Sequence, residues 1–175
     1  YFQTTHNYSD DGFFLKFCPQ CTPQEVTASP NTSVCPGDSV KIAGLGLAPS
    51  VKNTWSWSPA PSAPVNNDTV WVKPLVTTTY TVTGTDSLGC SDTSVVTITV
   101  HPKPVIKTSA DTSVCIGDST KLSVTGNFTT WTWSPLPPNF INDSTVYVKP
   151  LATITYTITG VNANGCKDTA FIKVI

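Results

Sequence analysis

Six cysteines are the residues of this chain best suited to chemistry: Cys18, Cys21, Cys35, Cys90, Cys115 and Cys166. Cysteines bind zinc, exchange disulfides or act as nucleophiles, and each role has its own spacing. The first two form a Cys-x-x-Cys pair, which is also half of a zinc site or a redox motif. A structural zinc site needs four ligands and no second such pair follows, while a redox pair expects a βαβ context that is missing. We therefore predict structural disulfides, which form in an oxidising compartment.

An internal repeat is the strongest feature of the sequence as a whole. Cys-Pro-Gly-Asp-Ser-Val-Lys at 35–41 returns as Cys-Ile-Gly-Asp-Ser-Thr-Lys at 115–121. Trp-Ser-Trp-Ser-Pro at 55–59 returns as Trp-Thr-Trp-Ser-Pro at 131–135. Repeated modules are typical of stalks, arrays and binding surfaces rather than of a single catalytic centre.

The repeat also sorts the cysteines into equivalent positions, since Cys35 matches Cys115 and Cys90 matches Cys166. Each module should be able to close its own bridge, which would stabilise a small core by about 4 kcal/mol. The bridges predicted in this way are Cys35–Cys90, Cys115–Cys166 and a local Cys18–Cys21. The sequence alone leaves other pairings open.

Few other residues point to catalysis or to a metal. Only His6 and His101 could act as general bases near neutral pH, and neither lies near a nucleophile motif. Oxygen ligands for calcium could come from 66–68, Asp86 and Asp92, but the spacing is not that of an EF-hand, and such residues ordinarily form turns. We predict no enzymatic activity, no metal and no cofactor.

The composition excludes several classes of protein. Charged residues make up 12% of the chain, about half the usual share, the net charge is -1 and arginine is absent. A nucleic-acid binder would carry a basic patch, and anionic membranes attract basic segments. No apolar run is long enough to span a bilayer, so we expect neither nucleic acid nor membrane insertion. The start at Tyr1, without Met, suggests a piece of a longer precursor.

Short segments with alternating polarity, separated by Gly, Pro, Asn and Asp, predict an all-β protein. The strands expected in the first repeat are 25–29, 39–43, 52–58, 69–73, 78–86 and 93–100, and the second repeat follows the same plan. Two antiparallel sheets packed face to face fit this pattern best, with a closed barrel as the alternative. We predict an N-terminal extension at 1–25 and two modules at 26–102 and 103–175.

Alternation also assigns aromatic residues to faces. Trp55 and Trp57 share a face and should be in the core, although an exposed platform for a sugar is the alternative. Trp71 lies between two valines that should face inward, so it should face outward, and Tyr147 occupies the same place in the second repeat. These two form a candidate contact surface for a module, a subunit or a glycan; alternatively, they cover a neighbouring strand.

Two segments lie outside the repeats. In the extension, Phe13, Leu15 and Phe17 alternate with other residues as in a strand that lacks partners of its own. This strand could pack on the first module, belong to an upstream domain or add to the sheet of a neighbouring molecule. Between the modules, the prolines at 102 and 104 favour a semi-rigid spacer.

The motifs Trp-x-Trp-Ser-Pro, Val-x-Val-Lys-Pro-Leu, Thr-Tyr-Thr-Val-Thr-Gly and Gly-Cys-x-Asp-Thr together resemble a known group. They are similar to the immunoglobulin-like, PKD-like repeats of large surface and secreted proteins of Bacteroidota, and the resemblance covers about 26–175. It implies two tandem immunoglobulin-like β-sandwiches with an N-terminal extension strand. It also implies that Cys35–Cys90 staples one end of the sandwich, and that the protein is exported by a type IX secretion system to the cell surface as a spacer or adhesive repeat, without enzymatic activity.

The resemblance further implies O-glycosylation, because proteins of this phylum carry glycans on Asp-Ser or Asp-Thr followed by a small or apolar residue. The acceptors would be Ser39, Thr69, Ser87, Ser119, Ser144 and Thr169. The same dipeptides are also common at turns.

Three functions therefore compete. The first is a structural and adhesive rod that assembles into a surface filament or stalk, with copies of itself or neighbouring domains of a longer precursor as partners. The second is an adhesion module that binds polysaccharide through Trp71 and Tyr147. The third is a spacer attached to a larger secreted enzyme.

Overall fold

The computed structural model describes residues 25–47, 53–61, 67–137 and 143–175. Within these ranges the chain forms thirteen β-strands and no helix. Consequently, none of the described residues belongs to a helix that could cross a membrane. Phe13, Leu15, Phe17, His6 and the Cys18–Cys21 pair lie outside the described residues.

The first seven strands form a sandwich that we call module 1. Its smaller sheet has the order β1-β3-β5, and its larger sheet has the order β2-β7-β6-β4. All pairs are antiparallel except β2 with β7. The strands are β1 (Thr27–Ala28), β2 (Thr32–Val34), β3 (Val40–Leu45), β4 (Thr54–Ser58), β5 (Thr69–Val72), β6 (Thr78–Thr85) and β7 (Ser91–Val100).

The remaining strands form module 2, which repeats this plan. One sheet has the order β11-β9-β8 and the other β10-β12-β13. A single parallel bridge between Thr112 and Val174 stands in place of the β2–β7 pair. The strands are β8 (Ile106–Thr108), β9 (Thr120–Gly126), β10 (Thr130–Ser134), β11 (Thr145–Val148), β12 (Ile154–Val161) and β13 (Lys167–Val174).

Each module has its own core, built from alternate residues of the two facing sheets. In β6, Tyr80 and Val82 point inward, and in β12 Tyr156 and Ile158 do the same. The two buried clusters share no residue. The structure is thus two separate sandwiches of open sheets, which confirms the predicted fold class over a closed barrel.

The tryptophan predictions hold in part. Trp57 is buried, with 5% of its surface exposed, but Trp55 is only half-buried and packs at the margin of the core. Trp71 and Tyr147 do face outward. Among the described strands of module 1, the sequence missed β2, and this short strand decides where the first cysteine lies.

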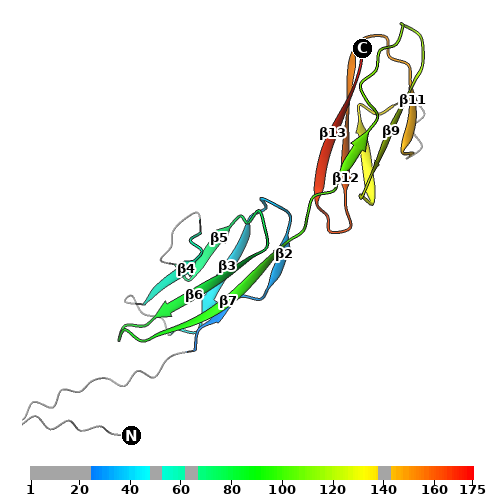
Figure 1. The fold of residues 1–175 in the computed structure, drawn as a ribbon. Coiled ribbons are helices and arrows are strands. Elements are labelled where there is room, and N and C mark those ends of the chain that lie inside the picture. The colour runs from blue at the N-terminus through cyan, green and yellow to red at the C-terminus, as the bar shows by residue number, and fades with distance from the viewer. Residues whose placement is uncertain (1–24, 48–52, 62–66, 138–142) are drawn as a thin grey trace, which may run out of the picture.

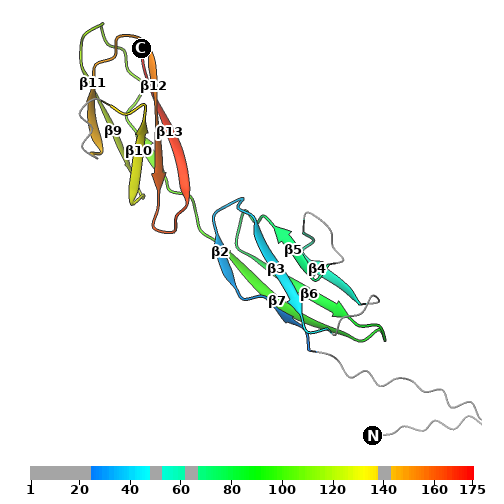
Figure 2. The ribbon, with the colours of Figure 1, turned by 180° about the vertical axis from the view of Figure 1, so that it is seen from behind.

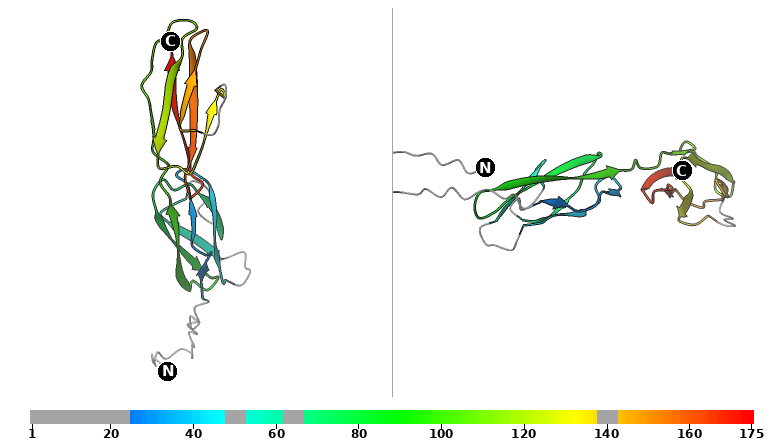
Figure 3. Two further views of the ribbon diagram at one scale, coloured as in Figure 1. Left: turned by 90° about the vertical axis from the view of Figure 1, so that its right-hand side faces the viewer. Right: turned by 90° about the horizontal axis from the view of Figure 1, so that it is seen from below.

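The two modules lie end to end, so the molecule is elongated (Figure 1). The same arrangement is visible from behind (Figure 2) and from the side and below (Figure 3). Residues 101–105 connect them without a strand of their own. The C-terminus lies at the end of module 2 that points away from module 1 (Figure 1).

Candidate functional site: the junction between the modules

The predicted bridge within module 1 is wrong, because its two cysteines lie at opposite ends of the sandwich. Cys35 follows β2, whose last residue, Val34, pairs with Val100 at the end of β7. Cys90 directly precedes the start of β7. That strand has ten residues, so about 30 Å separates its ends at the rise of an extended chain. A disulfide needs Cα atoms within about 7 Å.

The same reasoning excludes the predicted bridge in module 2. The N–H of Val114 donates to the carbonyl of Ile175 at 3.0 Å, so Cys115 lies beyond the end of β13. Cys166 lies before the start of that eight-residue strand. Each module therefore carries one cysteine at each end, and neither pair can close within its own sandwich.

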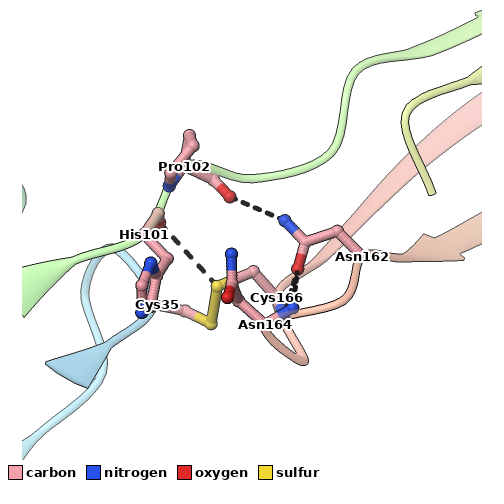
Figure 4. Close-up of a disulfide and its surroundings, with 6 residues drawn as sticks. All are labelled: Cys35, His101, Pro102, Asn162, Asn164 and Cys166. Atoms are coloured by element: carbon pink, nitrogen blue, oxygen red, sulfur yellow. Dashed lines mark hydrogen bonds between the residues drawn. A yellow bond between two sulfur atoms is a disulfide. The ribbon is translucent and has the colours of Figure 1, made fainter. Parts of the chain in front are cut away.

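Cys35 instead bonds to Cys166, across the junction between the modules (Figure 4). The S–S distance is 2.00 Å and the Cα atoms are 5.4 Å apart, although 131 residues separate them in sequence. Cys90 is also disulfide-bonded. Cys115 is free and exposed, contrary to its predicted role in a bridge.

A tight turn presents Cys35 at the end of module 1; we call residues 35–38, and the equivalent 115–118, the top turn. In module 1, the N–H of Asp38 donates to the carbonyl of Cys35 at 3.1 Å, and Gly37 has φ 85°. Left-handed backbone of this kind favours glycine. Module 2 repeats the turn: Asp118 donates to Cys115 at 3.0 Å, and Gly117 has φ 92°.

A second turn presents Cys166; we call residues 162–166, and the equivalent 86–90, the base turn. The side-chain oxygen of Asn162 accepts the N–H groups of Asn164 and Cys166, each at 3.0 Å. Asp86 holds the base turn of module 1 in the same way, accepting from Leu88 at 2.8 Å and from Cys90 at 2.9 Å. A side chain that caps its own turn fixes where the cysteine points.

Asn162 does more than Asp86 can, because an amide also donates. Its Nδ2 donates to the carbonyl oxygen of Pro102 in the linker at 2.9 Å (Figure 4). The Sγ of Cys166 lies 3.7 Å from the carbonyl oxygen of His101. The linker is therefore held against the base turn of module 2 beside the disulfide.

The rest of the junction is thin and polar. Lys103 Nζ lies 3.9 Å from Asp168 Oδ1, and both side chains are about half exposed; such pairs contribute roughly 0–1 kcal/mol. A shallow cleft at the junction is lined by Ser33, Val34, Cys35, Asp38, Ser39, His101, Asn164 and Gly165. Apart from the linker, the Cys35–Cys166 disulfide is thus the principal connection between the modules.

This cleft brings together a serine, a histidine and an aspartate, which invites comparison with a nucleophilic site. Among the described residues, however, no hydrogen bond joins the side chains of Ser39, His101 and Asp38, so a nucleophile with its base is not assembled. No cluster of three or more metal-ligating side chains occurs in the described part of the chain either.

The predicted contact residues lie away from the junction. Trp71 on β5 is 59% exposed and Tyr147 on β11 is 66% exposed. Each stands opposite a lysine in the adjacent strand, Lys41 and Lys121 respectively. Of the candidate O-glycosylation acceptors, Ser39, Ser87, Ser119 and Thr169 are exposed, whereas Thr69 and Ser144 are half-buried.

Comparisons with known proteins extend only to the fold. No protein-family model matches the chain, and no curated protein matches it. Among solved structures, the first eight Ig domains of DSCAM align over 86% of this chain and 27% of theirs, at 11% identity and a TM-score of 0.45. The insect immune protein hemolin aligns over 87% and 46%, at 16% identity and 0.43. Murine CEACAM1b aligns over 86% and 100%, at 16% identity and 0.37.

The strands and sheets described above make this chain a tandem pair of immunoglobulin-like β-sandwiches. The site that sequence reasoning missed is the disulfide across the junction. The repeat did carry a signal for it, since equivalent cysteines near the two ends of a module can pair between neighbours as well as within one module.

Proposed function

We propose that this chain is a non-catalytic extracellular module, a structural and adhesive rod in which disulfides fix successive immunoglobulin-like units head to tail. The observation that carries this proposal is the Cys35–Cys166 bond between the two modules. Structural disulfides persist in oxidising compartments, which supports an extracellular location. A covalent staple next to a proline-containing spacer holds two modules at a set angle, as a rod requires.

The finer identity rests on the motifs. The Trp-x-Trp-Ser-Pro and Gly-Cys-x-Asp-Thr elements support a PKD-like repeat of a type IX-secreted surface protein of Bacteroidota. In that setting the rod would extend a filament or stalk, with neighbouring domains of a longer precursor or copies of itself as partners. Service as a spacer for a secreted enzyme uses the same rod.

The experiment is small-angle X-ray scattering of the oxidised chain, of the chain with thiol reductant, and of the double variant Cys35→Ser/Cys166→Ser. The oxidised protein should give one narrow distribution of interatomic distances. Reduction or the double substitution should broaden it, because only thin polar contacts and a short linker then connect the modules. Cys115→Ser is the matched control and should leave the distribution unchanged. Identical curves for the oxidised and reduced chain would contradict the proposal.

Glycan adhesion is a second candidate, favoured by the exposed aromatic at the same position of both modules. Trp and Tyr are enriched at interfaces because each combines a large apolar ring with a group that can hydrogen-bond. Trp71→Ala with Tyr147→Ala should abolish polysaccharide binding without changing the melting temperature. Phe171→Ala, another exposed aromatic (61%), is the control and should have no effect. Unchanged binding in the double variant would exclude this surface.

A further inference from the structure

The two top turns have the same sequence plan and geometry but different states. Cys35 is bonded across a junction, whereas Cys115 is free and exposed. The residues that module 1 contributes to the junction cleft are Ser33, Val34, Cys35, Asp38 and Ser39. Their counterparts in module 2 are Ser113, Val114, Cys115, Asp118 and Ser119. Module 2 thus presents the same set of residues at its outer end.

The outer end of module 2 is held in place by backbone hydrogen bonds. The N–H of Val114 donates to Ile175 at 3.0 Å, and the N–H of Ile175 donates to Thr112 at 2.9 Å. Together with the turn bond from Asp118, these contacts fix the backbone on both sides of Cys115. In module 1 this same framework places a cysteine within bonding distance of a base turn.

We propose that Cys115 is the attachment site for the base turn of a further immunoglobulin-like module, placed after module 2 as module 2 is placed after module 1. The proposal deepens the function proposed above and rests on it. The partner needs a Gly-Cys pair in a turn capped by an asparagine side chain, as in 162–166. It also needs a linker carbonyl for that side chain to bind, as Pro102 provides.

An apolar hollow beside Cys115 is not part of this proposal. It is lined by Val114, Ile116, Pro150, Leu151, Ala152, Thr153 and Ile175. Leu151 corresponds to Leu75 of module 1, which stays 71% exposed although module 2 is joined there. A partner that docks in the same way would leave Leu151 exposed as well, so the cysteine and its polar neighbours form the site.

The bond forms by oxidation of two thiols. The Cys115 thiolate attacks a disulfide oxidant such as glutathione disulfide and releases one reduced glutathione. The partner's thiolate then attacks the sulfur of Cys115 in the mixed disulfide and releases the second reduced glutathione. Two thiols lose two electrons and two protons in total, and one glutathione disulfide is reduced.

The test is a longer chain with a copy of residues 100–175 joined directly after Ile175. This register is correct because Ile175 corresponds to Thr99, so the copied Val100 follows in phase. The copy carries Cys115→Ser, which leaves its Cys166 as the one added cysteine. After oxidation with glutathione disulfide, peptide mapping without reduction should find Cys115 linked to the added cysteine, in addition to the Cys35–Cys166 link.

A matched variant tests whether the thiol must stand at position 115 or only near it. Ser113 is exposed and lies two residues before Cys115, so the longer chain with Cys115→Ser and Ser113→Cys keeps a thiol close by but outside the top turn. We expect the cross-link to the added cysteine to be lost in this variant. Equal yields from both positions would overturn the proposal, whether or not the added module folds.

The same peptide map tests the attachment site at Cys115 and the proposed rod separately. If Cys35–Cys166 forms while Cys115 and the added cysteine both remain open to alkylation, the attachment site is refuted and the proposed rod stands. If Cys35–Cys166 is itself absent, both are refuted.

Discussion

The two ends of module 2 have similar turns, but only one of their cysteines is in a disulfide. At its base turn, Cys166 is bonded to module 1, and Asn162 donates to the linker. At its top turn, the equivalent of a bonded cysteine is a free thiol. Neither cysteine can reach the other within the sandwich. The bond of Cys166 is therefore made across the junction between the modules, and module 2 carries one further cysteine, unbonded, at its opposite end.

The cores of the two modules are packed differently, although their strands are arranged alike. In module 1, Gly44 leaves room for the ring of Trp55. In module 2 the equivalent position is Val124, which is buried, and Phe128 packs against Trp131 with ring centroids 5.3 Å apart. The two modules thus fill the same arrangement of strands with different side chains, so we expect that placing one residue of module 2 in module 1 disturbs the packing.

The largest effect should come from the separate cores. Leu122→Ala removes a fully buried side chain of module 2 and should destabilise that module by about 2–5 kcal/mol, because its cluster contains no residue of module 1. Ile42→Ala is the matched change in module 1. Hydrogen exchange should show lost protection in the mutated module alone. Loss in both modules together would mean that the cores are coupled.

A smaller loss of stability should follow from exchanging the residues at the equivalent positions 44 and 124. A Cβ at position 44 would lie 2.7 Å from both Trp55 and Val82, so Gly44→Val should cost about 1–3 kcal/mol through overpacking. Val124→Gly should also destabilise, since it removes a buried side chain. Chemical denaturation measures both changes. A neutral Gly44→Val would show that the two interiors are interchangeable.

Much of this architecture could be predicted from the sequence. Period-two alternation predicted the strand at 78–86 that is β6 and its counterpart in the second repeat, and flanking valines predicted that Trp71 and Tyr147 face outward. The repeat allows cysteines to pair within a module or between modules, and the choice could not be predicted because it depends on three residues, Thr32–Val34, that pair in parallel with the far end of β7. So short a strand has no periodicity of its own, and the partner of Cys35 follows only from the assembled modules.

The junction hydrogen bond should have a modest effect on the disulfide. Asn162→Asp keeps the cap on the base turn but removes the donor to Pro102, a contribution of about 0.5–1.5 kcal/mol. We expect Cys35–Cys166 to become about two- to tenfold easier to reduce in glutathione redox buffers. Asp86→Asn makes the reverse change at the other base turn and should leave this equilibrium unaltered. If the Cys35–Cys166 bond is equally easy to reduce in both variants, the hydrogen bond from Asn162 does not stabilise the junction.

The smallest effect should be a local dependence on pH in module 1. The carboxylate of Asp92 accepts the N–H of Val26 at 2.8 Å, and this backbone hydrogen bond lowers the pKa of Asp92. A carboxyl with a lowered pKa in the folded state stabilises above its unfolded value and loses that contribution as the pH falls through the folded value.

Protection of the Val26 amide from exchange should therefore fade below about pH 4, and NMR measures this directly. Asp92→Asn should remove the pH dependence. A Val26 amide whose protection is constant down to pH 2 would count against this contact.

The central claim is that the modules are joined by a disulfide and not closed individually. The most direct measurement is a peptide map, without reduction, of the native 175-residue chain after alkylation of free thiols. We expect a cross-linked peptide pair containing Cys35 and Cys166, and an alkylated Cys115. Peptides linking Cys35 to Cys90 and Cys115 to Cys166 would contradict the head-to-tail rod.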